Sequence, residues 1–231
     1  MPRLDDSRPA LLDAIQSRYG PPAPSGRGPG PDDDPFARIL VEALGLSADP
    51  RTVASALTAL AAEGLLDPAA LAAADPSELE ALFQAHRIRL TAKAVAPALK
   101  LARWVQWSGF DRAAAEVAST EALREAWRGL RGIGQATADA LLLHALDRPA
   151  YPVDRGSYRI FLRHGWIDAS ADYDEARSVF ESVAPDDAPT LVALSAGLQR
   201  LAREFCKPGT PRCEHCPLRP LLPEGGPLGE E

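Results

Sequence analysis

The stretch that decides the predicted fold is LRGIGQATADALLLHALDRPAYPVDRGSYRIFLRHG, residues 130–165. Gly132 and Gly134 flank one isoleucine and predict a tight turn, because glycine has no Cβ and adopts positive φ at little cost. A helix is expected from about Gln135 to His144. Its free amides and the positive end of its dipole would face the turn, which favours phosphate binding there. An ordinary connection between two packed helices would show the same glycines.

The second half of this stretch brings an acid to the start of another helix. A short loop through Pro149 and Pro152 leads to Asp154, which directly precedes the pattern of a helix. Aspartate at such a position is a common N-cap. A structural role and a chemical role are therefore both open for Asp154, and the two are compatible.

Three segments resemble a known family. LRGIGQATADALLLHAL is similar to the helix-hairpin-helix of the endonuclease III superfamily of DNA glycosylases, and PVDRGSYRIFLRHG is similar to that family's catalytic-aspartate segment. YDEARSVFE, at Tyr173–Glu181, resembles the branch that includes bacterial 3-methyladenine glycosylases. The resemblance covers roughly residues 35–217.

The resemblance implies an all-α fold of two helical lobes that flank a DNA-binding cleft. Residues 35–147 would form a six-helix barrel domain that carries the hairpin. Residues 8–34 and 148–222 would form a discontinuous lobe with Asp154 and a cysteine-cluster loop, followed by a disordered tail at 223–231. The all-α class also follows from the sequence itself, where helical patterns recur and no alternating strand pattern is seen.

The resemblance also implies base-excision repair of double-stranded DNA. Such an enzyme extracts a damaged base from the stack before it cleaves the bond to the sugar. Asp154 would be the catalytic residue, stabilising positive charge on the deoxyribose or orienting the attacking water. The residues expected to bind DNA are Gly132, Ile133, Gly134, Gln135, Ala136, Thr137, Lys207 and Arg212.

One departure from the family pattern predicts the type of glycosylase. Bifunctional relatives carry a lysine in a motif resembling GxGxKTA, and Ala136 occupies that position here. Without the amine no Schiff base forms at this position, so strand cleavage by β-elimination loses its usual catalyst. The chain has three lysines, Lys93, Lys100 and Lys207, and none lies in the motif. We therefore expect a monofunctional glycosylase.

The expected substrate class is alkylated purines, because a cationic alkylated base leaves with little help from a general acid and the site offers one carboxylate. A damaged or mismatched pyrimidine is the alternative. A different class of function is also open: a catalytically inactive or weak protein that binds DNA structures or mismatches. A general helical interaction protein would leave the clustered cysteines unexplained.

All three cysteines lie near the C-terminus, in the pattern Cys206-x6-Cys213-x2-Cys216. Clustered cysteines in an odd number argue for a metal site rather than disulfides. The pattern is similar to the first three ligands of the family's [4Fe-4S] loop, whose fourth cysteine would fall at Leu222. We favour an iron–sulfur cluster whose fourth ligand is not cysteine.

The fourth ligand stays open between water, His215 and Glu224, and a three-iron cluster or no cluster are further possibilities. The competing metal is zinc, held by the three cysteines and His215. In either case the loop would have a structural role and present Lys207 and Arg212 to DNA phosphates.

Charge is unevenly distributed along the chain. The formal net charge is −7, but residues 124–164 carry seven arginines against four acids, and residues 200–219 carry five basic residues against two acids. Positive charge thus gathers around the motifs, as phosphate contact requires. Because no signal peptide and no long apolar run are seen, we expect a soluble, cytoplasmic, nucleoid-associated monomer.

Helix starts follow a repeated Asp-Pro pattern at residues 34–35, 49–50, 67–68 and 75–76. Aspartate caps free amides and proline fits the first helical position; Asp75 and Glu78 also have the spacing of a capping box. Further helices are expected at about 8–20, 91–104 with a bend or restart at Pro97, 119–127, 173–182 and 189–205. Residues 1–7 are expected to fray, and 21–34 to form an irregular crossing segment.

Overall fold

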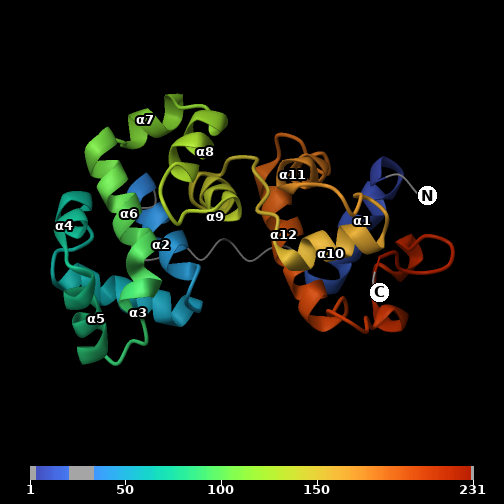
Figure 1. The fold of residues 1–231 in the computed structure, drawn as a ribbon, viewed down its shortest axis with the longest axis horizontal. Helices are drawn as coiled ribbons and strands as arrows, with labels where there is room; N and C mark the ends of the chain where they lie inside the picture. The colour runs from blue at the N-terminus through green and yellow to red at the C-terminus, as the bar shows by residue number, and fades with distance from the viewer. Residues whose placement is uncertain (1–3, 21–33, 230–231) are drawn as a thin grey trace. The chain divides into compact units, whose positions relative to one another are not determined.

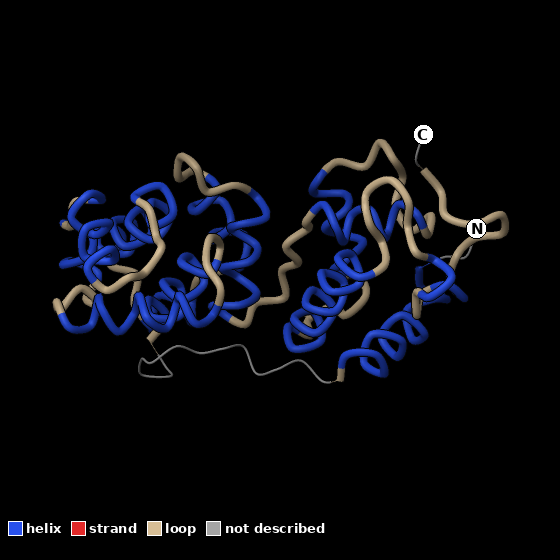
Figure 2. Tube along the Cα trace, turned by 90° about the horizontal axis from the view of Figure 1, so that it is seen from below, coloured by secondary structure: helices blue, strands red, loops and turns tan. Residues whose placement is uncertain are grey.

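The computed structural model of the 231-residue chain describes residues 4–20 and 34–229. Within these ranges all regular elements are helices and none is a strand (Figures 1 and 2). The all-α fold class is therefore confirmed. The predicted crossing segment at 21–33 lies outside the described residues.

The chain divides into two compact units. One is Pro24–Asp147, and the other combines Met1–Ala23 with Arg148–Glu231. The chain passes from the first unit to the second between Asp147 and Arg148. Each unit is described by itself below, and the first is called the hairpin unit and the second the cysteine unit.

The hairpin unit begins with four helices that start as predicted. They are α2 (Pro35–Gly45), α3 (Pro50–Ala62), α4 (Pro68–Ala73) and α5 (Pro76–Ala85). Each has proline in its first turn and an aspartate N-cap whose carboxylate accepts bonds from backbone amides. For α5 the structure shows the Asp75 half of the predicted capping box, with bonds from the Ser77 and Glu78 amides.

The centre of the hairpin unit is α6 (Ala92–Ser108), which packs against α2, α4 and α5. The helix is continuous through Pro97, so the expected restart there is wrong. Proline removes one helical hydrogen bond, and the buried face of α6, which includes Leu99 and Leu101, outweighs that loss. The short helix α7 (Arg112–Val117) was not predicted, and α8 (Thr120–Arg128) was.

The cysteine unit is built on α12 (Ala188–Glu204), which packs against α10 (Arg155–Arg163) and α1 (Leu4–Tyr19). A Cβ on Gly197 of α12 would collide with the Ile15 side chain of α1, so glycine is what permits this close approach. The unit is completed by α11 (Tyr173–Glu181) and two short 3-10 turns, η2 (Cys213–His215) and η3 (Arg219–Leu221).

Both ends of the described chain are more ordered than predicted. The first helix begins at Leu4, and Pro9 lies inside it, so residues 4–7 are not frayed. The tail is also ordered over residues 223–229: Pro223 is buried, and the Leu228 amide donates to the Arg163 carbonyl at 2.8 Å. The prediction of disorder from Pro223 is therefore wrong for 223–229. The tail is held by a hydrogen bond to a residue distant in sequence, and the composition of the tail does not reveal such a contact.

Among the described residues, no helix combines the length and the apolar character that crossing a bilayer requires.

Candidate functional site

The predicted glycine turn connects α8 to α9 (Gln135–Ala140) as a helical hairpin. Gly132 has φ +90°, in the region that favours glycine, and both Gly132 and Gly134 are exposed. Between them Ile133 is 4% exposed and anchors the loop in the core. The loop thus shows its backbone outward while one side chain holds it in place.

The start of α9 differs from the starts of the capped helices. Its N-cap is Gly134, and no side chain caps its first amides among the described residues. Gln135, Ala136 and Thr137, the first residues of this helix, are half-buried. Open amides at a helix start favour an anion. The helix then widens into the π-turn η1 (Leu141–Ala145), close to the predicted end at His144.

Lysine reaches the hairpin loop from another helix. Lys100 lies on α6, and its Nζ donates to the Arg131 carbonyl at 2.5 Å. A Cβ on Gly132 would lie 2.8 Å from the same Nζ. The sequence motif lacks a lysine, but the fold brings one cation against the loop, a tertiary contact that linear spacing does not reveal.

A buried ion pair joins the two helices of the hairpin. Arg124 of α8 is 5% exposed and Asp139 of α9 is 0% exposed, and the Arg124 Nε donates to the Asp139 Oδ1 at 2.7 Å. Arg124 also bonds the Glu121 carboxylate. This arginine is therefore committed to the fold and does not contribute to a surface for phosphates.

Asp154 is the N-cap of α10. Its Oδ1 accepts from the Gly156 and Ser157 amides at 2.6 and 2.8 Å, and the Ser157 hydroxyl completes a capping box by accepting from the Asp154 amide. Both cap bonds use Oδ1; among the described residues Oδ2 has no hydrogen-bond partner, and the residue is half-buried. Asp154 is thus an N-cap, as its position in the sequence indicated, and capping uses only one of its two carboxylate oxygens.

Close packing fixes the position of this cap. A Cβ on Gly156 would lie 2.7 Å from the Ala202 Cβ and 3.0 Å from the Asp154 Oδ1, so only glycine fits between α10 and α12. Beneath the cap, Tyr151 is fully buried and its ring stacks on Phe180 at 4.3 Å. Burial raises the pKa of the Tyr151 hydroxyl, and the negative charge of Asp154 raises it further.

The three cysteines line one cavity of the cysteine unit. Its walls also include Arg163, His164, Leu218 and Leu222, and the space within them is about 360 Å³ including its opening. Arg163 is 2% exposed and its Nη1 donates to the Cys206 Sγ at 3.2 Å. Sulfur ligands around a void, with a buried cation beside one of them, fit a bound cluster of several iron and sulfur atoms.

Zinc fits this site less well. His215 is exposed and does not line the cavity that all three cysteines share; it lines an adjoining surface hollow with Glu214 and with one of the cysteines, Cys213. Within the part of the chain that the structure describes, no three His, Cys, Asp or Glu side chains form a group for a single metal ion. A mononuclear zinc site needs four ligands around one point.

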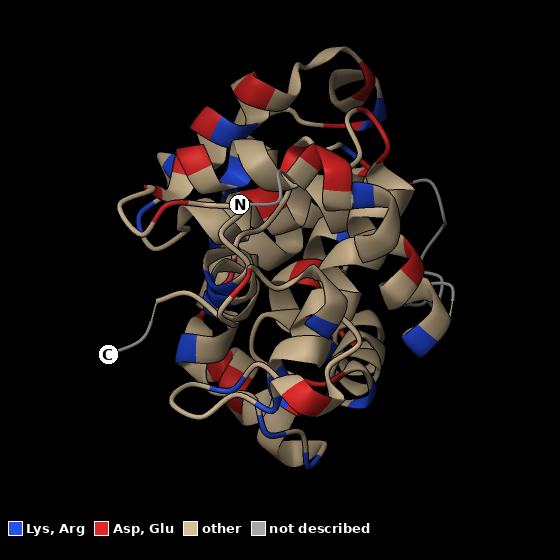
Figure 3. Cartoon of the chain, turned by 90° about the vertical axis from the view of Figure 1, so that its right-hand side faces the viewer, with Lys and Arg blue, Asp and Glu red and all other residues tan. Residues whose placement is uncertain are grey.

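The remaining predicted DNA contacts lie on the cysteine loop. Arg212 is exposed and Lys207 is half-buried, with its carbonyl accepting from Arg163. Basic and acidic residues are interspersed along the ribbon (Figure 3). Because Arg163 is buried like Arg124, the count of basic residues overstates the free positive charge near the motifs. The hairpin residues and Asp154 belong to different units.

Sequence inspection missed Glu42, a half-buried carboxyl on α2. Burial alone raises its pKa to about 7. No hydrogen bond or ion pair to this carboxyl is seen among the described residues. A carboxylic acid that keeps its proton near neutral pH has the property required of a general acid. The only signal in the sequence is a glutamate amid the apolar run ILVEAL.

The raised pKa of Glu42 predicts how stability varies with pH. The pKa of Glu42 is about 7 in the folded protein and 4.5 in its ordinary state. The folded state therefore binds this proton more tightly than the unfolded chain does. The stability that the bound proton contributes is complete below pH 4.5 and is lost as the pH rises to about 7. Glu42→Gln is therefore expected to raise the free energy of unfolding at pH 8 by on the order of 1–3 kcal/mol. Urea unfolding at pH 8 and pH 5 measures the effect.

Near pH 5 the gain should be much smaller than at pH 8, because the native glutamate is then protonated. Glu63→Gln is the control, since Glu63 is exposed at the end of α3. An equal gain at both pH values would contradict the argument from burial.

The helical hairpin, the capping aspartate of α10 and the all-α fold define a class of protein. The chain has the fold of endonuclease III and resembles DNA glycosylases of the helix-hairpin-helix superfamily in sequence. The resemblance seen in the motifs is thus confirmed. No family model matches the chain.

The relatives are DNA repair proteins. The chain is 35% identical over 97 residues to MJ1434 of Methanocaldococcus jannaschii, named as a DNA repair glycosylase, covering 42% of this chain and 44% of that protein. It is 30% identical over 90 residues to endonuclease III of Thermotoga maritima, covering 39% and 41%. The matched stretches span less than half the length of these relatives.

The solved structures agree on the fold over nearly the whole chain. An endonuclease III trapped as a covalent DNA intermediate superimposes with a TM-score of 0.67 at 20% identity, covering 97% of this chain and 98% of that one. A thermostable thymine-DNA glycosylase gives 0.65 at 19% identity, with 94% and 95% covered. The 3-methyladenine glycosylase MagIII of H. pylori, bound to 1,N6-ethenoadenine, gives 0.58 at 18% identity, with 84% and 97% covered.

Proposed function

We propose that this protein is a DNA glycosylase of base-excision repair, and that it hydrolyses the bond between a damaged base and its deoxyribose. The observation that carries the proposal is the Asp154 carboxylate, fixed through Oδ1 by two backbone amides with Oδ2 left over. Similarity to DNA repair glycosylases over 97 residues supports it.

The glycine turn, the start of α9 and Asp154 have different roles in this mechanism. The exposed Gly132–Gly134 turn and the uncapped start of α9 bind backbone phosphates of the damaged strand. The target nucleotide is flipped out of the duplex. Asp154 then stabilises the positive charge that develops on the deoxyribose, or orients the water that attacks it. Because the cap already holds this carboxylate, little reorganisation is needed when charge develops.

The proposed substrate class is alkylated purines in double-stranded DNA. Alkylation makes the base a cation and a good leaving group, so one carboxylate is sufficient for its release. The likeness to a structure whose ligand is 1,N6-ethenoadenine supports a purine substrate. The thymine-DNA glycosylase among the structural neighbours keeps mismatched pyrimidines as the alternative.

The proposed cofactor is an iron–sulfur cluster held by Cys206, Cys213 and Cys216, which line one cavity. When bound, the cluster braces the cysteine loop and has no part in base release. The residues Lys207 and Arg212 of that loop then contact DNA phosphates, Arg212 through an exposed guanidinium.

We expect base release without strand cleavage. A duplex with a single 7-methylguanine, which is a cationic alkylated purine, should release that base. The strand should be cut at the resulting abasic site only when mild alkali is added, and borohydride should trap no covalent complex. Ala136 provides no amine, and Lys100 already donates to the Arg131 carbonyl. Gel electrophoresis of the labelled strand, with and without alkali, measures this outcome.

If borohydride does trap a covalent complex with DNA, two variants identify the lysine that forms it. Lys100→Met removes the amine at the hairpin, whereas Lys93→Met removes an exposed lysine of the same helix and serves as the control. Trapping that Lys100→Met abolishes and Lys93→Met preserves would overturn the monofunctional assignment and make Lys100 the nucleophile.

The second candidate is a DNA-structure-binding protein without turnover. It is favoured by one observation: N-capping of α10 already accounts for the presence of Asp154. This candidate predicts binding to abasic or mismatched duplexes by both the wild type and Asp154→Asn, with no base release by either.

A further inference from the structure

Among the described residues, the walls of the cysteine cavity contain three side chains that are able to bind iron. They are the thiols of Cys206, Cys213 and Cys216. The other polar side chains of the wall are Arg163, Arg219 and His164. Arginine is always protonated and has no lone pair to donate, so both arginines are excluded as ligands.

His164 is also excluded, because both of its ring nitrogens lie against backbone carbonyl oxygens of its own surroundings. Nδ1 lies 2.7 Å from the Ile160 carbonyl and Nε2 lies 3.3 Å from the Leu218 carbonyl, and the side chain is 4% exposed. The ring stacks on Trp166 at 4.6 Å, which fixes its orientation. Rotating it toward the cavity would break these contacts.

The position that the cysteine spacing gives to a fourth ligand is Leu222, and its side chain lines the same cavity. Pro227 of the ordered tail lines it as well. The two residues considered as replacements, His215 and Glu224, are exposed and do not line the cavity. Apolar side chains, Leu222 and Pro227, therefore line the cavity where the family's fourth cysteine would lie.

We propose that the chain supplies three thiolates and no fourth ligand, so that one iron of a four-iron cluster binds only a small exogenous ligand such as water and is released readily. This inference rests on the cluster proposed above and not on glycosylase activity. An iron bound to the protein through a cysteine is retained by that bond, whereas an iron without one is retained only by the sulfides of the cluster.

Release of this iron is a balanced oxidation. A [4Fe-4S] cluster with charge 2+ transfers one electron to an added one-electron oxidant, ferricyanide, which becomes ferrocyanide. The cluster loses one Fe²⁺, and a [3Fe-4S] cluster with charge 1+ remains. The three thiolates stay bound throughout, and no protein group changes its protonation state.

The experiment uses the full chain, purified without oxygen, and two cysteine variants. Leu222→Cys places a thiol on the cavity wall, whereas Leu221→Cys places one on the neighbouring residue, which does not line the cavity. Iron and sulfide are counted per chain, and the electron paramagnetic resonance signal of the three-iron cluster is quantified after one equivalent of ferricyanide.

The wild type and Leu221→Cys should develop the three-iron signal and lose one iron per cluster. Leu222→Cys should reduce that signal by at least about fivefold, because the added thiolate retains the fourth iron. Equal signals in the wild type and Leu222→Cys would overturn the inference, as would a protein that binds zinc and no sulfide. Base release, assayed on the same samples, tests the glycosylase proposal separately.

Discussion

Asp154→Asn is expected to lower the rate of base release by about 100-fold or more, because the amide carries no negative charge to stabilise the sugar cation. The free energy of unfolding should change by less than about 0.5 kcal/mol, since asparagine caps a helix nearly as well as aspartate. Single-turnover release from a duplex containing 7-methylguanine and urea unfolding measure the two effects.

Asp172→Asn is the matched control for this experiment. Asp172 caps α11 in a capping box of the same type, and its Oδ1 accepts from the Glu175 amide at 2.9 Å. It should leave base release unchanged. If Asp154→Asn releases bases at the wild-type rate, Asp154 is only a helix cap. If neither the wild type nor Asp154→Asn releases bases but both bind abasic duplexes, the second candidate function is correct.

Asp139→Ala is expected to lower the free energy of unfolding by about 3 kcal/mol, because the Arg124 guanidinium loses its buried carboxylate partner, whereas the Glu121 carboxylate that also pairs with it is largely exposed. Arg124 is 5% exposed, and the distance between its Nε and the Asp139 Oδ1 is 2.7 Å. The pair connects the two helices of the hairpin, so DNA affinity should fall together with stability. Urea unfolding and binding to an abasic duplex measure both.

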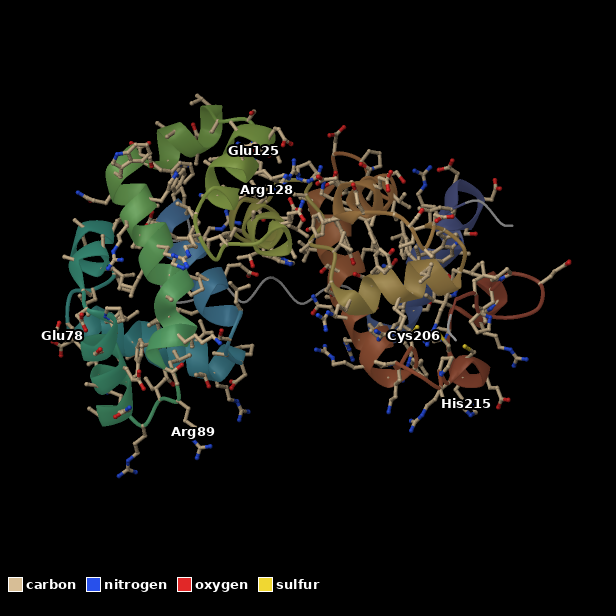
Figure 4. The ribbon with its side chains drawn as sticks, viewed as in Figure 1. Glu78, Arg89, Glu125, Arg128, Cys206 and His215 are labelled. Carbon is tan, nitrogen blue, oxygen red and sulfur yellow. The ribbon has the colours of Figure 1, made fainter. Side chains whose placement is uncertain are left out.

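Glu125→Ala tests whether burial is the cause. Glu125 pairs with Arg128 on the exposed side of α8, at 3.3 Å (Figure 4). Loss of this surface pair should change stability by less than about 0.5 kcal/mol. Comparable losses in the two variants would show that the Arg124–Asp139 pair has no special importance for the hairpin.

Helix starts could be predicted from the sequence because their chemistry is local. An aspartate followed by proline satisfies free amides and fits the first turn, so Asp34, Asp49, Asp67 and Asp75 mark their helices correctly. The helix α7 was missed because Asp111 caps it without a proline and the helix buries no residue. The helix α1 begins at Leu4, four residues before the start predicted at Arg8 from the apolar spacing.

The parts of the site that depend on distant contacts could not be predicted. Lys100 reaches the hairpin loop across 31 positions of sequence, and the raised pKa of Glu42 results from burial that only the folded chain creates. The tail from Pro223 looked disordered by composition, but its Leu228 amide finds the carbonyl of Arg163. The glycine turn and the cysteine spacing were visible because each lies within a few residues.

The packing of α1 on α12 has a consequence for synthesis on the ribosome. Residues 34–147 are contiguous, so the hairpin unit is complete in sequence when Asp147 has emerged from the exit tunnel. In contrast, the Ile15 side chain of α1 can be buried only after Gly197 of α12 has been synthesised. The apolar face of α1, with Leu11 at 0% exposure in the folded protein, thus remains uncovered until α12 is translated. A nascent chain therefore exposes that apolar face until α12 has been synthesised.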